Sequence, residues 1–192
     1  MTGSILLAAA VLTITLVIFL RARRLDPRPR KGTILDRLEG TVRLRDIYRL
    51  AVSMEEDGAA FYRRLAERAA DPEAKKLCSR LADEEDVHRD IFKRQLDEWR
   101  VLPVHHTLWP ALLEEVRQKG IFCCPPAADA SEEEMTAYAI RQEVATMEFY
   151  RSFETAFPQA WKRARLHDLV VEEDRHAREL RALHARLNPP AQ

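Results

Sequence analysis

The chain has 192 residues, and its 31 basic and 31 acidic side chains leave no net charge at neutral pH. This balance excludes the strongly basic surface by which proteins bind nucleic acid, so no nucleic-acid partner is expected. Only five glycines favour an all-helical chain, and three cysteines without a C-x-x-C pair favour a reducing compartment.

The first predicted element is a membrane anchor at residues 1–24. Residues 1–20 contain no charged side chain, and twenty helical residues span about 30 Å, the thickness of the hydrocarbon core. Three arginines follow between residues 21 and 24, which predicts that the rest of the chain lies on the cytoplasmic side of the inner membrane. A cleaved signal peptide or a short buried helix is the alternative.

A basic linker at residues 25–41 is expected to lead into four helices. Asp71 and Pro72 predict the N-cap and first residue of the second helix, and Pro158 interrupts the second half at nearly the equivalent place. The helices are expected near residues 42–69, 72–100, 131–156 and 159–187.

These helices are expected to form two hairpins, joined by a long crossover at residues 101–130 that contains four prolines. Two hairpins with a long crossover have the connectivity of ferritin-like four-helix bundles. The predicted fold is therefore all-α, with an N-terminal transmembrane helix, a ferritin-like bundle over residues 42–187 and a short tail at 188–192.

The two hairpins repeat one pattern at an interval of 88 residues. In both copies a Glu precedes a Tyr by seven residues and an E-x-x-H motif by thirty. The members are Glu55, Tyr62, Glu85 and His88 in the repeat at 42–100, and Glu143, Tyr150, Glu173 and His176 in the repeat at 131–187. Glu and His three residues apart project from one helix face, where a single Glu on a partner helix can meet them.

This pattern predicts a two-metal site inside the bundle. Each unpaired carboxylate in a helical core would cost on the order of several kcal/mol, whereas two divalent cations balance the four negative charges. Oxygen and imidazole ligands without thiolate favour two iron ions, with manganese as the alternative, over a structural zinc. A solvated acidic helix face would explain one such motif, but two copies with identical spacing argue against it.

Neighbouring carboxylates fall off the inward helix faces and are predicted to lie on the surface; they are Glu56, Glu84, Glu148 and Glu172. Cys78 shares an inward face with Glu85 and is predicted to be a small core residue. The roles of Cys123 and Cys124 in the crossover are left open.

Residues 54–62, together with the two E-x-x-H motifs, resemble the di-iron domain of the rubrerythrin group in the ferritin-like superfamily, over about residues 42–187. The resemblance implies that Glu85 and Glu173 bridge two metals, and that Tyr62 and Tyr150 assist the reaction as hydrogen-bond donors to ligand carboxylates. The metal ligands that it implies are Glu55, Glu85, His88, Glu143, Glu173 and His176.

The chain also departs from that group at two places. It ends at Gln192 without the rubredoxin domain of rubrerythrins proper, so an external electron donor is expected. Thr146 occupies the position where rubrerythrins have an additional Glu, which favours a simpler site of four Glu and two His.

The predicted function is that of a membrane-anchored di-iron protein whose diferrous centre reacts with hydrogen peroxide or dioxygen, in peroxide reduction or ferroxidation. The resemblance favours peroxide, whereas Thr146 favours dioxygen. Two alternatives stay open: an iron-binding homeostasis module, and an accessory subunit of a membrane complex that the metal mainly stabilises. A homodimer and a membrane-complex partner are both compatible with the sequence.

Overall fold

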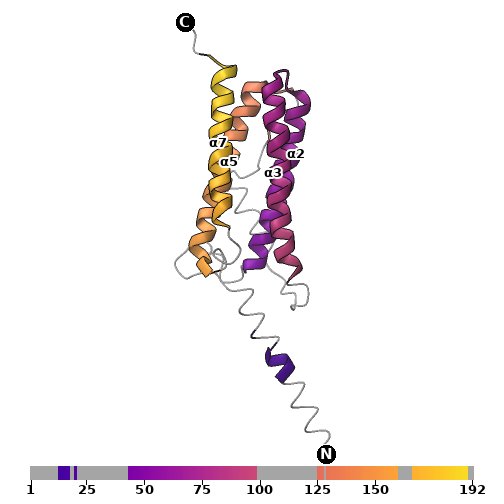
Figure 1. The fold of residues 1–192 in the computed structure, drawn as a ribbon, viewed down its shortest axis with the longest axis vertical. Coiled ribbons are helices and arrows are strands. Elements are labelled where there is room, and N and C mark those ends of the chain that lie inside the picture. The colour runs from indigo at the N-terminus through magenta and orange to yellow at the C-terminus, as the bar shows by residue number, and fades with distance from the viewer. Residues whose placement is uncertain are drawn as a thin grey trace, which may run out of the picture.

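The computed structural model describes residues 13–17, 20, 43–98, 125–127, 129–159 and 166–189. Long helices make up most of these residues: α2 (Leu44–Arg68), α3 (Pro72–Asp97), α5 (Glu132–Ala156) and α7 (His167–Leu187). They lie side by side as a bundle, with α2 and α3 in purple to magenta and α5 and α7 in orange to yellow in Figure 1. This all-helical architecture is consistent with the predicted ferritin-like bundle.

Capping interactions determine where α3 and α5 begin. The Asp71 carboxylate accepts a hydrogen bond from the Ala74 N–H at 2.8 Å, and Pro72 occupies the first helical position, as predicted. At the start of α5, the Ser131 hydroxyl accepts from the Glu134 N–H at 3.1 Å, and the Glu134 carboxylate accepts from the Ser131 N–H at 2.8 Å. These caps fix the first turns of α3 and α5.

Contacts at one end of the bundle show which helices run in opposite directions. Arg68 at the end of α2 donates to the Ala130 carbonyl just before α5, at 2.7 Å. Arg186 near the end of α7 donates to the Asp71 carboxylate just before α3, at 2.7 and 2.8 Å. Helix α2 is therefore antiparallel to α5, and α3 is antiparallel to α7.

Two apolar clusters fill the bundle, and a polar layer separates them along the helix axes. Both clusters take buried residues from all four helices. The first includes Tyr48 and Phe153, whose rings stack with centroids 5.7 Å apart, and the second includes Phe61, Tyr138 and the buried Cys78. Because all four helices pack in both clusters, the polar layer is held from both sides. The prediction that Cys78 is a core residue is confirmed.

No helix among the described residues is both long enough and apolar enough to cross a membrane. Of the segment predicted to be that anchor, residues 1–24, only 13–17 and 20 are described. The predicted linker at 25–41 and most of the crossover, including Cys123 and Cys124, lie outside the described residues.

Candidate metal centre

The polar layer consists of the six predicted ligands. Glu55 comes from α2 and Glu143 from α5, while α3 and α7 each contribute one E-x-x-H motif. All six residues are at most 3% exposed. Buried carboxylates and imidazoles at this density are stable only if other charges or protons balance them.

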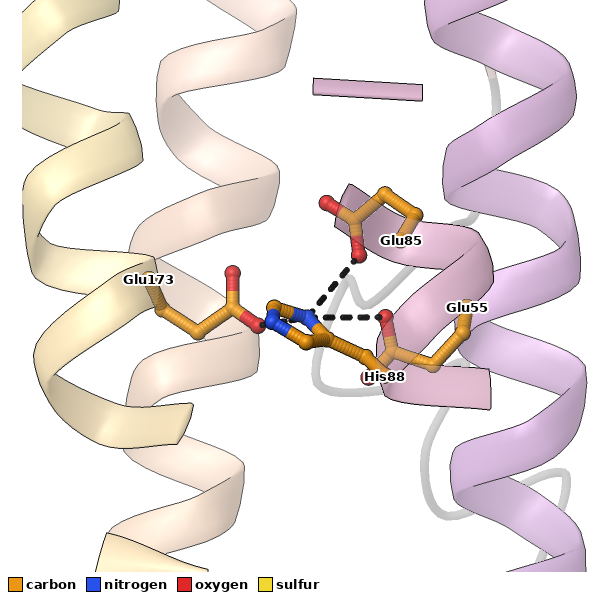
Figure 2. A group of neighbouring side chains, drawn as sticks. All are labelled: Glu55, Glu85, His88 and Glu173. Carbon is orange, nitrogen blue, oxygen red and sulfur yellow. Dashed lines mark ion pairs between the residues drawn. The ribbon is translucent and has the colours of Figure 1, made fainter. Parts of the chain in front are cut away.

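The first half of the layer surrounds His88 (Figure 2). The His88 Nδ1 atom lies 3.3 Å from Glu173 Oε1, 3.5 Å from Glu85 Oε2 and 3.9 Å from Glu55 Oε2. The three carboxylates come from three different helices, and Figure 2 shows them converging on the ring from α2, α3 and α7. One ligand atom from each of the four residues lies within 4.8 Å of the others, so that one cation could contact all of them.

The second half surrounds His176 in the same way. The His176 Nδ1 atom lies 3.4 Å from Glu143 Oε2, 3.4 Å from Glu173 Oε2 and 3.8 Å from Glu85 Oε1. Glu85 and Glu173 therefore belong to both halves, with one oxygen of each carboxylate facing each histidine. The two imidazole rings stack with centroids 5.9 Å apart. This geometry suits two cations that share a pair of bridging carboxylates.

The unsatisfied polar atoms of the layer provide a test of that fit. Buried atoms without a hydrogen-bond partner include His88 Nδ1, Glu143 Oε2, both oxygens of Glu173 and His176 Nδ1. Such atoms are rare in folded proteins, because each one carries an uncompensated desolvation cost. Five of the six such side-chain atoms among the described residues are potential metal ligands within this layer, and the sixth is Glu132 Oε1, so the donor set fits a pair of divalent cations.

Without metal, protons must balance the charge of this layer. Burial and the neighbouring Glu85 raise the pKa of Glu55 well above its usual value, and burial and Glu173 do the same for Glu143. Burial alone would lower the pKa of His176, but its contacts with Glu143 and Glu173 outweigh burial and raise it to about 11. Metal ions would therefore displace protons from these groups.

Two buried tyrosines connect the repeats. The Tyr62 hydroxyl on α2 donates to Glu143 Oε1 on α5, and the Tyr150 hydroxyl on α5 donates to Glu55 Oε1 on α2. Burial and the nearby Glu143 raise the pKa of Tyr62 further above its normal range, so its hydroxyl keeps its proton and remains a donor. Each tyrosine leaves one oxygen of its carboxylate facing the histidines.

Sequence reasoning missed two residues of the site, Glu84 and Glu172. His88 Nε2 lies 2.6 Å from Glu172 Oε2, and His176 Nε2 lies 2.9 Å from Glu84 Oε2. The prediction that both carboxylates lie on the surface is incomplete: the side chains of Glu84 and Glu172 are 28% and 43% exposed, but each also contacts a histidine of the layer. A hydrogen bond at Nε2 orients each ring so that Nδ1 faces the layer.

A sequence signal for these two residues was present, because a Glu-Glu doublet precedes the histidine in both repeats. The other two carboxylates that were predicted to lie on the surface, Glu56 and Glu148, are exposed.

Comparison with known proteins connects the first repeat to one family. Residues 33–101 match the family model for rubrerythrin, a ferritin-like di-iron family, and this match includes α2 and α3. No curated protein and no solved structure matches the chain. The first repeat is thus similar to rubrerythrin, and the second repeat supplies the same ligand types at the same spacing.

Proposed function

We propose that this chain is a di-iron oxidoreductase that reduces hydrogen peroxide with electrons from an external donor. The observation that carries the proposal is the buried layer in which two histidines present unpartnered Nδ1 atoms to a shared pair of carboxylates. Ligands of this type suit iron or manganese, and the similarity to rubrerythrin favours iron.

Each residue of the layer has a defined task in this proposal. Glu55 and His88 would hold one iron and Glu143 and His176 the other, while Glu85 and Glu173 would be shared between them. Four carboxylates and two divalent ions then have no net charge, which removes the cost of burying the acids.

The bound iron pair would supply two electrons to the oxidant, which together with two protons convert one peroxide into two waters. The protein's own groups prepare the site for this reaction. Tyr62 donates a hydrogen bond to Glu143, and Tyr150 donates one to Glu55. Glu84 and Glu172 hold the rings of His176 and His88 in the orientation that would bind metal. Because the layer is buried between two apolar clusters, only a small oxidant is expected to reach it.

Electron counting favours peroxide over dioxygen. Peroxide accepts two electrons, which one iron pair can provide in a single event, whereas dioxygen needs four to become water. Thr146, buried three residues after Glu143, provides no additional carboxylate. A site of four Glu and two His would favour dioxygen if it behaved like ferritin, so the oxidant has to be tested directly.

The test is anaerobic stopped-flow mixing of the Fe(II)-loaded protein with peroxide or dioxygen at equal concentration. We expect faster oxidation by peroxide, with one peroxide consumed for two irons. Faster oxidation by dioxygen, with hydrogen peroxide accumulating in solution, would identify a ferroxidase instead. If neither oxidant reacts within minutes, the metals serve a structural or storage role. Protein carrying Glu85→Gln, which removes a shared ligand, provides the control for iron in solution.

The uncharged sequence of residues 1–20 supports a further part of the proposal, attachment to the inner membrane with the bundle on the cytoplasmic side. We expect the chain to remain in the membrane pellet after high-salt and carbonate washes, and deletion of residues 1–24 to release a folded helical domain. Release of the intact chain by salt alone would contradict this attachment.

A further inference from the structure

On the side formed by α3 and α7, the metal layer has two edges, which are built from equivalent positions of the two repeats. One is the Glu84 edge, where Glu84 supports His176, and the other is the Glu172 edge, where Glu172 supports His88. The inner ligands of the two halves are identical in type. The residues around the two edges are not.

Two arginines hold the carboxylate at the Glu84 edge. The Nη1 atom of Arg80 lies 3.0 Å from both carboxylate oxygens of Glu84, and the Nη2 atom of Arg175 lies 3.2 Å from Glu84 Oε2. Arg80 also donates to Glu179 Oε2 at 2.5 Å. Two guanidinium groups and two carboxylates thus form a network across α3 and α7 with no net charge, in which Glu84 cannot move independently.

The Glu172 edge has no such network. At the positions 88 residues from the network's other members, Val87 replaces Arg175, Ile91 replaces Glu179 and Asp168 replaces Arg80. Among the described residues, His88 is the one hydrogen-bond partner that Glu172 has. The Glu172 edge therefore carries two acids and two apolar side chains, where the Glu84 edge carries two cations and two anions. The side chain of Glu172 is also more exposed than that of Glu84.

We propose that Arg80 and Arg175 are positioning residues that lock the Glu84–His176 pair, so that metal ions enter and leave the layer through the Glu172 edge. This inference rests on the proposed function, in which the layer binds two metals. A metal that leaves the layer at one of these edges must first be released by the histidine at that edge. His176 is held by a carboxylate that two arginines immobilise, whereas the carboxylate that holds His88 is free to move with the ring.

Charge favours the same route. A divalent cation approaching the Glu84 edge meets two guanidinium groups whose charge two carboxylates balance, whereas one approaching the Glu172 edge meets two acids, Glu172 near the ring and Asp168 on the same helix. Like charges slow the approach of an ion and opposite charges accelerate it. Single surface ion pairs contribute little to stability, but here the network acts on the mobility of one ligand and on the path of an ion.

The test is chelation of the full chain loaded with two Co(II) ions, followed by the visible absorbance of bound cobalt after mixing with excess EDTA. We expect two phases in the wild type, with rates at least about tenfold apart. Arg175→Val gives the Glu84 edge the residue found in the other repeat and should accelerate the slow phase about tenfold. Val87→Arg gives the Glu172 edge an arginine at an exposed position and should slow the fast phase.

Arg178→Ala is the matched control, because it removes an exposed arginine of α7 that pairs with Asp174 at 3.3 Å and contacts neither edge. Both rates should stay at their wild-type values in this variant. The absorbance spectrum of bound cobalt should change in Arg175→Val and remain unchanged in Arg178→Ala, because only the former alters the support of a ligand.

A single phase in the wild type, or unchanged rates in both Arg175→Val and Val87→Arg, would overturn the inference. If Arg175→Val does not fold, as judged by circular dichroism, the rate in Val87→Arg decides. Binding of fewer than two cobalt ions per chain would instead contradict the proposed two-metal function, so the two failures are distinguishable.

Discussion

Among the described residues, no arginine donates a hydrogen bond to the half-exposed carboxylate that supports His88, whereas two arginines hold the carboxylate that supports His176. The inner ligands of the two repeats are nevertheless the same. The buried residues of the layer are the same in both repeats because replacing any one of them would leave a buried charge without a partner. The outer positions are partly solvated and can differ without that cost.

Neither repeat holds a complete half of the layer by itself. Tyr62 of the first repeat holds Glu143 of the second, and Tyr150 holds Glu55 in return. The histidines are likewise supported by carboxylates of the opposite repeat. The segment that matches rubrerythrin, residues 33–101, therefore contributes candidate ligands whose hydrogen-bond partners lie in the second repeat.

The largest expected effect comes from removing a ligand that both halves share. Glu85→Gln or Glu173→Gln should abolish binding of both metals, because each carboxylate faces both histidines. Glu55→Gln should affect mainly the His88 half. Metal analysis of anaerobically loaded protein measures the outcome, with the exposed Glu56→Gln as the control. Retention of two metals in Glu85→Gln would show that the halves do not share a ligand.

A change in pH should affect both repeats alike. Because the pKa of His176 is raised to about 11 and that of His88 is also raised, both rings carry an extra proton at pH 7 in the metal-free protein. Filling the layer should release at least about two protons, and affinity for the metal pair should rise about a hundredfold per pH unit. Calorimetry in buffers of different ionisation enthalpy measures this release. Release of no protons would mean that the imidazoles are already neutral.

Removing the outer carboxylates should have a smaller effect and separates the two edges. Glu84→Gln and Glu172→Gln should each lower metal affinity by about 10- to 100-fold, because each histidine loses a charged partner at Nε2. Titration with Co(II) provides the measurement, and the exposed Glu148→Gln is the control. Wild-type affinity in both variants would mean that these residues act only as surface residues and do not support the metal layer.

The smallest expected effect concerns the tyrosines that connect the repeats. Tyr62→Phe or Tyr150→Phe should lower the free energy of unfolding by about 1–3 kcal/mol, because each leaves a buried carboxylate oxygen without its donor. Urea denaturation of the metal-loaded protein tests this expectation. Similar losses in the two variants would show that the crossed contacts are energetically equivalent, and a loss in only one would extend the asymmetry of the edges to the interior.

Residue spacing is enough to identify which side chains share a helix face. Spacings of three, seven and thirty residues, repeated 88 residues apart, pointed to the six residues that the structure brings together, and Asp71 and Pro72 predicted the start of α3. Helix geometry is local, so side-chain directions within one helix follow from residue spacing alone.

The contacts of the other helix faces depend on how the helices pack against one another. Glu84 does lie off the inward face of α3, as its position in the sequence predicted, but α7 rather than water occupies that direction, and His176 and Arg175 meet the carboxylate there. The crossed tyrosine contacts and the arginine network likewise depend on which helices are neighbours and on their offsets along the bundle axis. Those offsets result from packing among residues far apart in the chain, which residue spacing within a single helix does not specify.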